Sequence, residues 1–151
     1  MSRDQSTKSS THQFNLRHIK EVENMSKFLN ISNHVLTQDQ LDDLDRMGFE
    51  EVLELPEDLK SRWGNCDPET YQDVCDDIVK YMDDNNIPSA HLAGYPAAVA
   101  YMCMTYISMD NMFYFSHTKR VSEEVRNPDG SVTKRNVFKH EGWHQFPWYM
   151  A

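Results

Sequence analysis

The sequence predicts an α+β protein, in which a mostly helical single domain surrounds a buried central helix and a β-hairpin follows near the C-terminus. Three features of the sequence lead to this prediction. A run of twenty-three residues, Ile87–Met109, contains no Asp, Glu, Lys or Arg, although the chain around it is densely charged. Helix-start and helix-stop signals recur before this run, and a Pro-Asp-Gly turn between two strand-like segments follows it.

The charge-free run is the expected centre of the core, because it can be buried without desolvating an ion. Its second half, Pro96–Met109, is almost entirely apolar or small, and Pro96 suits the first turn of a helix. A helix that is apolar on all sides lies either in a core or across a membrane. Pro88 and Gly94 interrupt the run, and its unbroken part is shorter than the ~20 residues of a bilayer crossing. We therefore expect a core helix and no membrane span.

The polar residues 1–13 are expected to form a disordered tail without a secretion signal. The globular domain is then expected to span residues 14–151, with helices over 14–112 and a hairpin and aromatic tail over 113–151. The first helix is predicted from apolar residues that follow one another mostly at steps of three. These residues are Leu16, Ile19, Val22, Met25, Phe28 and Leu29.

The next two helices are predicted from their end signals. Thr37 and Gln40 match the capping box at a helix start, and Gly48 suits the left-handed cap at its end. A short helix is expected between Pro56 and Gly64. The buried side of the first of these two helices is expected to carry Leu41, Leu44 and Met47.

The clearest helical pattern follows Asp67, which suits the cap, and Pro68, which suits the first turn. Pro88 lies beyond its expected end, and Met112–Phe115, rich in aromatic residues, is expected to be a strand. The apolar residues of this helix recur at helical spacing, and they are Tyr71, Val74, Cys75, Ile78, Val79 and Met82.

The hairpin is predicted from its turn, Asn127-Pro128-Asp129-Gly130, because Pro suits the first central position and Gly a left-handed position after it. A three-residue loop at this turn fixes the cross-strand register. Charged residues on both faces indicate that the hairpin is exposed or lies at a sheet edge. The expected pairs are Val125 with Thr133, Glu124 with Lys134, Glu123 with Arg135, and Val121 with Val137.

The net charge of −9 is concentrated in residues 37–86, which carry sixteen Asp and Glu against four Lys and Arg. This excess disfavours nucleic-acid binding by the acidic half, since phosphate contacts need Lys and Arg. It favours a protein partner with a basic surface. The three cysteines, Cys66, Cys75 and Cys103, show no C-x-x-C spacing, which indicates an intracellular, cytoplasmic setting.

One motif points to a catalytic metal site. His140-Glu141-Gly142-Trp143-His144 is an H-E-x-x-H, and with Val137 before it and Phe146 after it, the segment resembles the zincin metallopeptidase signature. The resemblance implies that His140 and His144 bind zinc from one helix face and that Glu141 is the general base. The seven residues after His144 contain no usual zinc ligand, so the third ligand is sought upstream, with His117 as the candidate.

A second local resemblance involves Met47-Gly48-Phe49, which looks like the turn of ubiquitin-associated domains, a family of three-helix bundles that bind ubiquitin. The same residues also fit an ordinary helix cap.

The leading functional hypothesis is a small, acidic, non-catalytic interaction protein. Its partner would contact the acidic residues 37–86 or a C-terminal aromatic patch. The alternatives are a compact zinc metallopeptidase and ubiquitin-type binding, so the sequence leaves open whether the protein is an enzyme. The aromatic patch consists of Trp143, Phe146, Trp148 and Tyr149.

Overall fold

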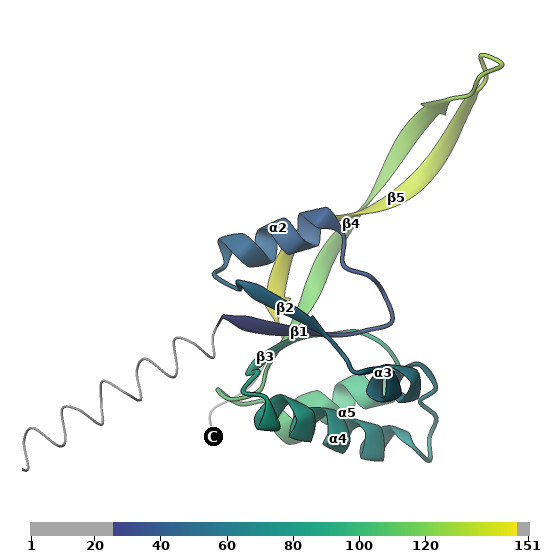
Figure 1. Cartoon of the computed structure of the whole chain (residues 1–151). Helices are drawn as coiled ribbons and strands as arrows, with labels where there is room; N and C mark the ends of the chain where they lie inside the picture. The colour runs from purple at the N-terminus through teal and green to yellow at the C-terminus, as the bar shows by residue number, and fades with distance from the viewer. Residues whose placement is uncertain (1–25, 148–151) are drawn as a thin grey trace, which may run out of the picture.

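The computed structural model describes residues 26–147 and contains five strands and four helices in that range (Figure 1). Helix accounts for 34% and strand for 36% of the structure. The prediction of a mostly helical protein is therefore wrong. The order is β1 (Lys27–Ile31), α2 (Gln38–Arg46), β2 (Glu51–Glu54), α3 (Glu57–Gly64), α4 (Tyr71–Asp84), β3 (Ser89–Leu92), α5 (Pro96–Tyr106), β4 (Met112–Arg126) and β5 (Val132–Gln145).

The five strands form one sheet in the order β2-β1-β3-β4-β5. The first four strands in this order are parallel to their neighbours, whereas β5 runs antiparallel to β4 at the edge. The chain moves from β1 outward to β2, and then returns past β1 to β3 and β4. Crossovers between parallel strands are right-handed, so this reversal of direction puts α2 on one face of the sheet and the helices that follow it on the other.

Figure 1 shows the resulting layers, with α2 on one face of the sheet and α3, α4 and α5 on the other. Two separate apolar clusters fill the spaces between the sheet and these helices. The cluster beneath α2 consists of Phe28, Leu36, Leu44, Phe49, Tyr114 and Trp143. The larger cluster on the other face includes Leu29, Ile31, Trp63, Val74, Ile78, Met82, Ala90, Leu92, Met102 and Phe113.

The centre of the molecule is a pair of parallel strands and not a helix. All of β3 and the last four residues of β1 are buried, because helices cover both faces of the sheet at these positions. Short parallel strands that are buried on both faces appear in a sequence as continuous apolar runs, without the alternation that identifies a half-exposed strand. The first predicted helix, which carried Leu16 to Leu29, is therefore wrong at Lys27–Ile31, and its part before residue 26 lies outside the described residues. The strands β2 and β3 were not predicted.

The predicted central helix is a peripheral one. α5 ends at Tyr106 and buries only Ala98 and Met102, whereas the side chain of Met104 is 87% exposed. On its inner side α5 packs against α4, where the hydroxyl groups of Tyr101 and Tyr106 both donate to Oδ1 of Asp76. The absence of charged residues from Ile87–Met109 therefore reflects the burial of β3 more than the burial of α5.

Several predicted elements are confirmed. The capping box is present at α2, with the Thr37 hydroxyl accepting from the Gln40 backbone and the Gln40 side chain accepting from the Thr37 backbone. Gly48 has φ of +99° at the end of this helix, but Met47 is 43% exposed and was wrongly assigned to its buried side. α4 buries the apolar residues expected of it except Tyr71, which is half-buried, and it begins at Tyr71, after the Asp67 and Pro68 predicted for its start. α3 spans the range predicted between Pro56 and Gly64.

The predicted tail, residues 1–13, lies outside the described residues. Within the part that is described, no helix combines the length and apolar content needed to cross a bilayer.

Candidate functional site

The antiparallel pair β4–β5 has two parts. The first part belongs to the sheet and packs on the body of the protein. The second part projects from the body as a two-stranded arm, which we define as residues 119–139 (Figure 1). The turn at its tip is the predicted one: the amide of Gly130 donates to the carbonyl of Asn127, and Gly130 has φ of +86°. All four predicted cross-strand pairs are present in the register. The prediction of an exposed hairpin is therefore confirmed.

No residue of the arm is buried, and only Val121, Asn127 and Val137 are half-buried. The arm also exposes apolar side chains, since Phe138 is 71% and Val132 is 52% exposed. Strand residues alternate between faces, so the even-numbered residues of β4 lie on the same side as α2. This α2-side face of the arm carries Arg120, Ser122, Glu124, Arg126, Val132, Lys134, Asn136 and Phe138.

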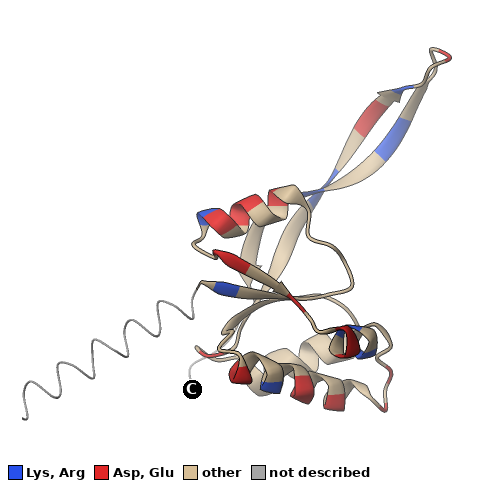
Figure 2. Cartoon of the chain, viewed as in Figure 1, with Lys and Arg blue, Asp and Glu red and all other residues tan. Residues whose placement is uncertain are grey.

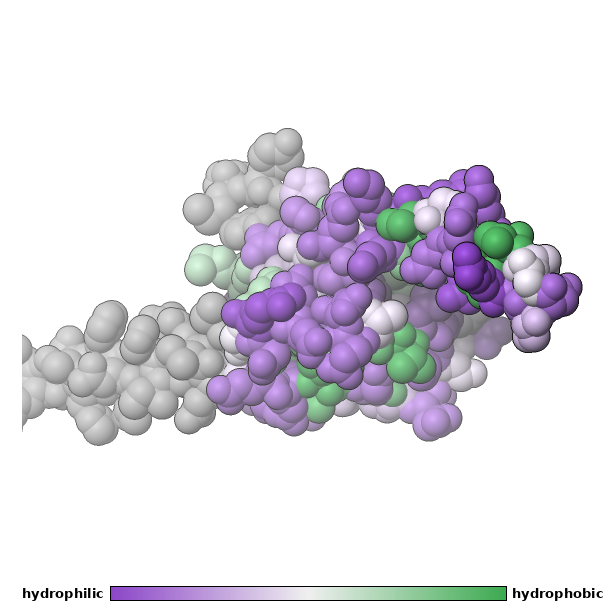
Figure 3. All heavy atoms as spheres, turned by 90° about the horizontal axis from the view of Figure 1, so that it is seen from above, coloured by the Kyte–Doolittle hydropathy of each residue, from purple (hydrophilic) through white to green (hydrophobic). Residues whose placement is uncertain are grey.

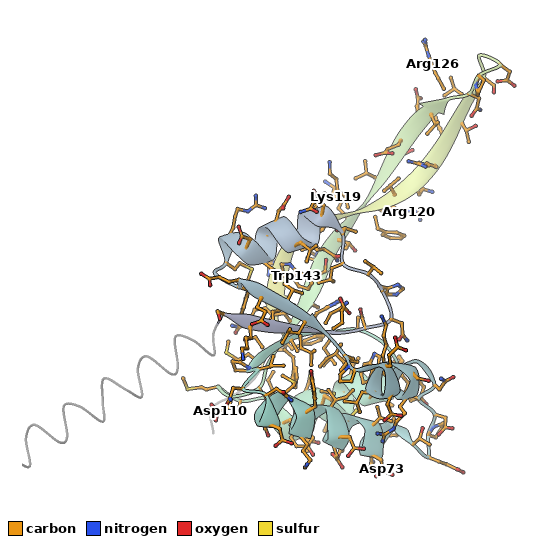
Figure 4. All side chains as sticks on the ribbon, viewed as in Figure 1. Asp73, Asp110, Lys119, Arg120, Arg126 and Trp143 are labelled. Carbon is orange, nitrogen blue, oxygen red and sulfur yellow. The ribbon has the colours of Figure 1, made fainter. Side chains whose placement is uncertain are left out.

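The arm is basic, whereas the body is acidic (Figure 2). Residues 119–139 carry six Lys and Arg against three Asp and Glu, a net charge of +3. α2, next to the base of the arm, carries four Asp against one Arg, a net charge of −3. Figure 4 shows Lys119 and Arg120 where the arm leaves the body and Arg126 near its tip. In the view from above, the surface is mostly hydrophilic, with separate small apolar groups (Figure 3).

A β-bulge at the base of the arm decides where the H-E-x-x-H residues point. The cross-strand register passes from His117 paired with Gly142 to Thr118 paired with His140, so Glu141 is the extra residue. As a result His140 and Trp143, three positions apart, share the α2-side face. Nε2 of His140 lies 2.9 Å from Oδ2 of Asp43, and the Trp143 indole N–H donates to the carbonyl of Gln40.

His144 lies on the opposite face, where its ring stacks on Phe115 with centroids 5.8 Å apart. The His117 ring is also 5.8 Å away, and Nε2 of His117 lies 3.5 Å from Oε2 of Glu141. The motif therefore occupies a strand and not the helix that the metallopeptidase hypothesis requires, and its two imidazoles do not share a face. Over residues 26–147 no three His, Cys, Asp or Glu side chains are grouped so that they could hold a metal ion.

The predicted aromatic patch is divided by the fold. Trp143 is only 7% exposed, with its ring centroid 5.4 Å from that of Phe28, so it belongs to the core beneath α2. Phe146 is half-buried, and its ring lies 5.1 Å from Phe115. Trp148 and Tyr149 lie outside the described residues. Trp143 is thus a structural residue that attaches β5 to α2.

The turn Met47-Gly48-Phe49 connects α2 to a strand and not to a second helix of a bundle. Phe49 is buried, with its ring 5.0 Å from Phe28. The three-helix architecture that the resemblance to ubiquitin-associated domains implied is therefore not the architecture of this chain, and the helix cap accounts for these residues.

A buried polar cluster lies at the carboxyl ends of β1 and β3, where the chain direction reverses across the sheet. The Oδ1 atom of Asn30 accepts from the Ser32 hydroxyl at 2.7 Å and lies 3.0 Å from Nδ1 of His91. The amide nitrogen of Asn30 donates to the carbonyl of His34 and to the carboxylate of Glu54. These bonds connect β1, β2 and β3 to the loop that leads into α2.

His91 is held as a neutral imidazole in this cluster. Burial lowers its pKa from 6.5 to about 4, and the nearby imidazoles of His34 and His140 contribute to the shift. Because Oδ1 of Asn30 can only accept, Nδ1 of His91 carries the proton when Asn30 is oriented in this way. No sequence pattern marked Asn30 or His91, because they become neighbours only when two non-consecutive strands pair.

The arm face was missed for a different reason. The predicted register already placed Arg120, Lys134 and Phe138 on one side of the hairpin, and alternation was the signal that could have identified this surface. The functional hypothesis instead concentrated on the aromatic residues that follow.

Comparison with known proteins identifies the family of the chain. No curated protein and no solved structure matches it. A family model described as the uncharacterized protein MJ1673 family matches residues 26–144, which include the body of the sheet and the whole arm. The match covers more than half of the chain, so this protein belongs to the uncharacterized protein MJ1673 family.

Proposed function

We propose that this protein is a non-catalytic interaction protein and that the arm is its docking element. The observation that carries the proposal is that residues 119–139 form a continuous antiparallel ladder without a single buried residue. A two-stranded ribbon with no further layer is only marginally stable in water. Exposed apolar side chains such as Phe138 add to the cost of leaving the arm uncovered.

The composition of the arm favours a protein surface that is acidic and partly apolar. Arg120, Arg126 and Lys134 have no ion-pair partner among residues 26–147, so their charges are available to a ligand. Nucleic acid is a poorer match, because the acidic α2 at the base of the arm would repel phosphates. The sequence suggested two contact surfaces, the acidic residues 37–86 and the C-terminal aromatic patch. The proposal keeps the acidic residues as a contact surface and replaces the aromatic patch by the arm.

The proposal is tested by photo-crosslinking in the cells that naturally produce the protein. A benzophenone amino acid replaces Phe138 on the arm, and in the matched control it replaces Met104 on α5, which is 87% exposed and also apolar. We expect a discrete protein adduct from position 138 and none from position 104. No adduct from position 138, or equal adducts from both positions, would overturn the proposal.

A further inference from the structure

We propose that the partner of the arm is a second copy of this chain, with the α2-side face of each arm lying on α2 of the other copy. This inference rests on the proposed docking role of the arm and names its occupant. Three observations on the described residues support it: the charges, the spacing of the contact groups, and the position of α2 relative to the arm.

The two surfaces are complementary in charge. The arm has a net charge of +3 and α2 a net charge of −3. On α2, the exposed carboxylates of Asp39 and Asp45 have no ion-pair partner within residues 26–147, whereas Asp43 is occupied by His140. On the opposite face of the arm, Arg135 is already paired with Glu123 at 3.5 Å. The α2-side face carries three cations without an ion-pair partner in the described part of the chain, Arg120, Arg126 and Lys134, which can meet these unpaired carboxylates, and Glu124 is its only acidic residue.

The spacing of the groups also fits. The nine residues of α2 give it a length of roughly 13 Å. Arg120 and Lys134 lie four positions apart along the ladder, which corresponds to ~13 Å. Exposed apolar side chains flank both surfaces, with Val35 and Met47 at the two ends of α2 and Phe138 on the arm. One helix can thus contact both cations and still meet an apolar side chain.

The arrangement repeats a contact that the protein already makes. Within one copy α2 packs on the α2-side face of β5 at the base of the arm, through Asp43 with His140 and Gln40 with Trp143. The free part of the arm continues this face outward. Since every copy has both an arm and an α2, a two-fold arrangement forms both contacts at once, as a self-complementary interface requires.

The test is sedimentation velocity on the purified full chain over a dilution series and at low and high salt. We expect a dimer that dissociates at high salt, since exposed ion pairs are screened. Arg120→Glu/Lys134→Glu should convert it to a monomer. The matched control is Lys119→Glu/Lys139→Glu, which makes the same charge change at a cross-strand pair on the opposite face and should leave the dimer intact.

Charge exchange provides the decisive variant. Asp39→Lys/Asp45→Lys alone should also give a monomer, and its combination with Arg120→Glu/Lys134→Glu should restore the dimer, which a merely destabilised fold would not do. Circular dichroism on each variant establishes that the fold is intact. A wild-type protein that is monomeric at every concentration would overturn the inference. A dimer that persists in Arg120→Glu/Lys134→Glu would overturn it as well.

The crosslinking described above separates this inference from the proposed function. An adduct of position 138 with α2 of the same protein supports both. An adduct with a different protein overturns the second-copy inference and leaves the docking role of the arm in place. The absence of any adduct overturns both.

Discussion

The two parts of the β4–β5 ladder share one continuous register but lie in opposite environments. Near the sheet, Phe113 is fully buried and Trp143 is 7% exposed. Beyond Thr118, every residue is exposed or half-buried, and charged side chains occupy both faces. Strand pairing alone therefore does not indicate how a segment is stabilised. The part near the sheet is held by packing between α2 and the other strands, whereas the arm depends on its turn, its cross-strand pairs and, in our account, a partner.

The largest expected difference between the two parts comes from removing one aromatic ring in each. Phe28 is fully buried against Phe49, Tyr114 and Trp143, so Phe28→Ala should lower the free energy of unfolding by about 3–5 kcal/mol. Phe138→Ala on the exposed arm should change it by less than about 0.5 kcal/mol. Urea denaturation of both variants as monomers measures the difference, and equal losses would contradict the division into body and arm.

The next effect is confined to the body and depends on pH. The folded-state pKa of His91 is lowered from 6.5 to about 4, so between these values the unfolded state binds more protons than the folded state. Stability should therefore fall as the pH decreases from 6.5 to 4, by about 3 kcal/mol in total.

His91→Gln, which cannot titrate in this range, is the control for that dependence. In urea titrations at several pH values, its free energy of unfolding should change less between pH 6.5 and pH 4 than that of the wild type. Parallel pH profiles for the two proteins would contradict the assignment of a neutral, buried His91.

A smaller effect is expected at the start of α2. The Thr37 side chain accepts a hydrogen bond from the backbone of Gln40 as part of the capping box. Thr37→Ala should cost about 1 kcal/mol in the free energy of unfolding. Thr37→Ser, which keeps the hydroxyl, should restore most of this loss. If Ala and Ser variants unfolded at the same urea concentration, the cap would not contribute.

The smallest effect on stability is expected from removing the arm altogether. Replacing residues 119–139 by Asn-Gly keeps the bulge and the part of the ladder that packs on the body. Because no buried residue is lost, the free energy of unfolding of the monomer should change by less than about 1 kcal/mol. A loss of several kcal/mol in chemical denaturation would show that the arm supports the body and is not a separate docking element.

The same division explains what the sequence could predict. The arm was predicted down to its cross-strand pairs, because its turn and register depend on residues close in the chain. The capping box and α4 were predicted for the same reason. β1 and β3 were not, because their pairing is non-local and their burial on two faces removes the alternating pattern. The placement of the H-E-x-x-H residues was not predicted, because the segment was considered as a helix, whereas it lies on β5 and the bulge at Glu141 puts its two imidazoles on opposite faces.

The measurement that tests the central claim most directly is backbone hydrogen exchange on the wild-type protein over a dilution series. If the arm docks on α2 of a second copy, exchange in residues 119–139 and in α2 should slow together as the concentration rises, while exchange in α4 stays constant. Exchange in the arm that is the same at all concentrations, or protection that appears in the arm without α2, would contradict the account.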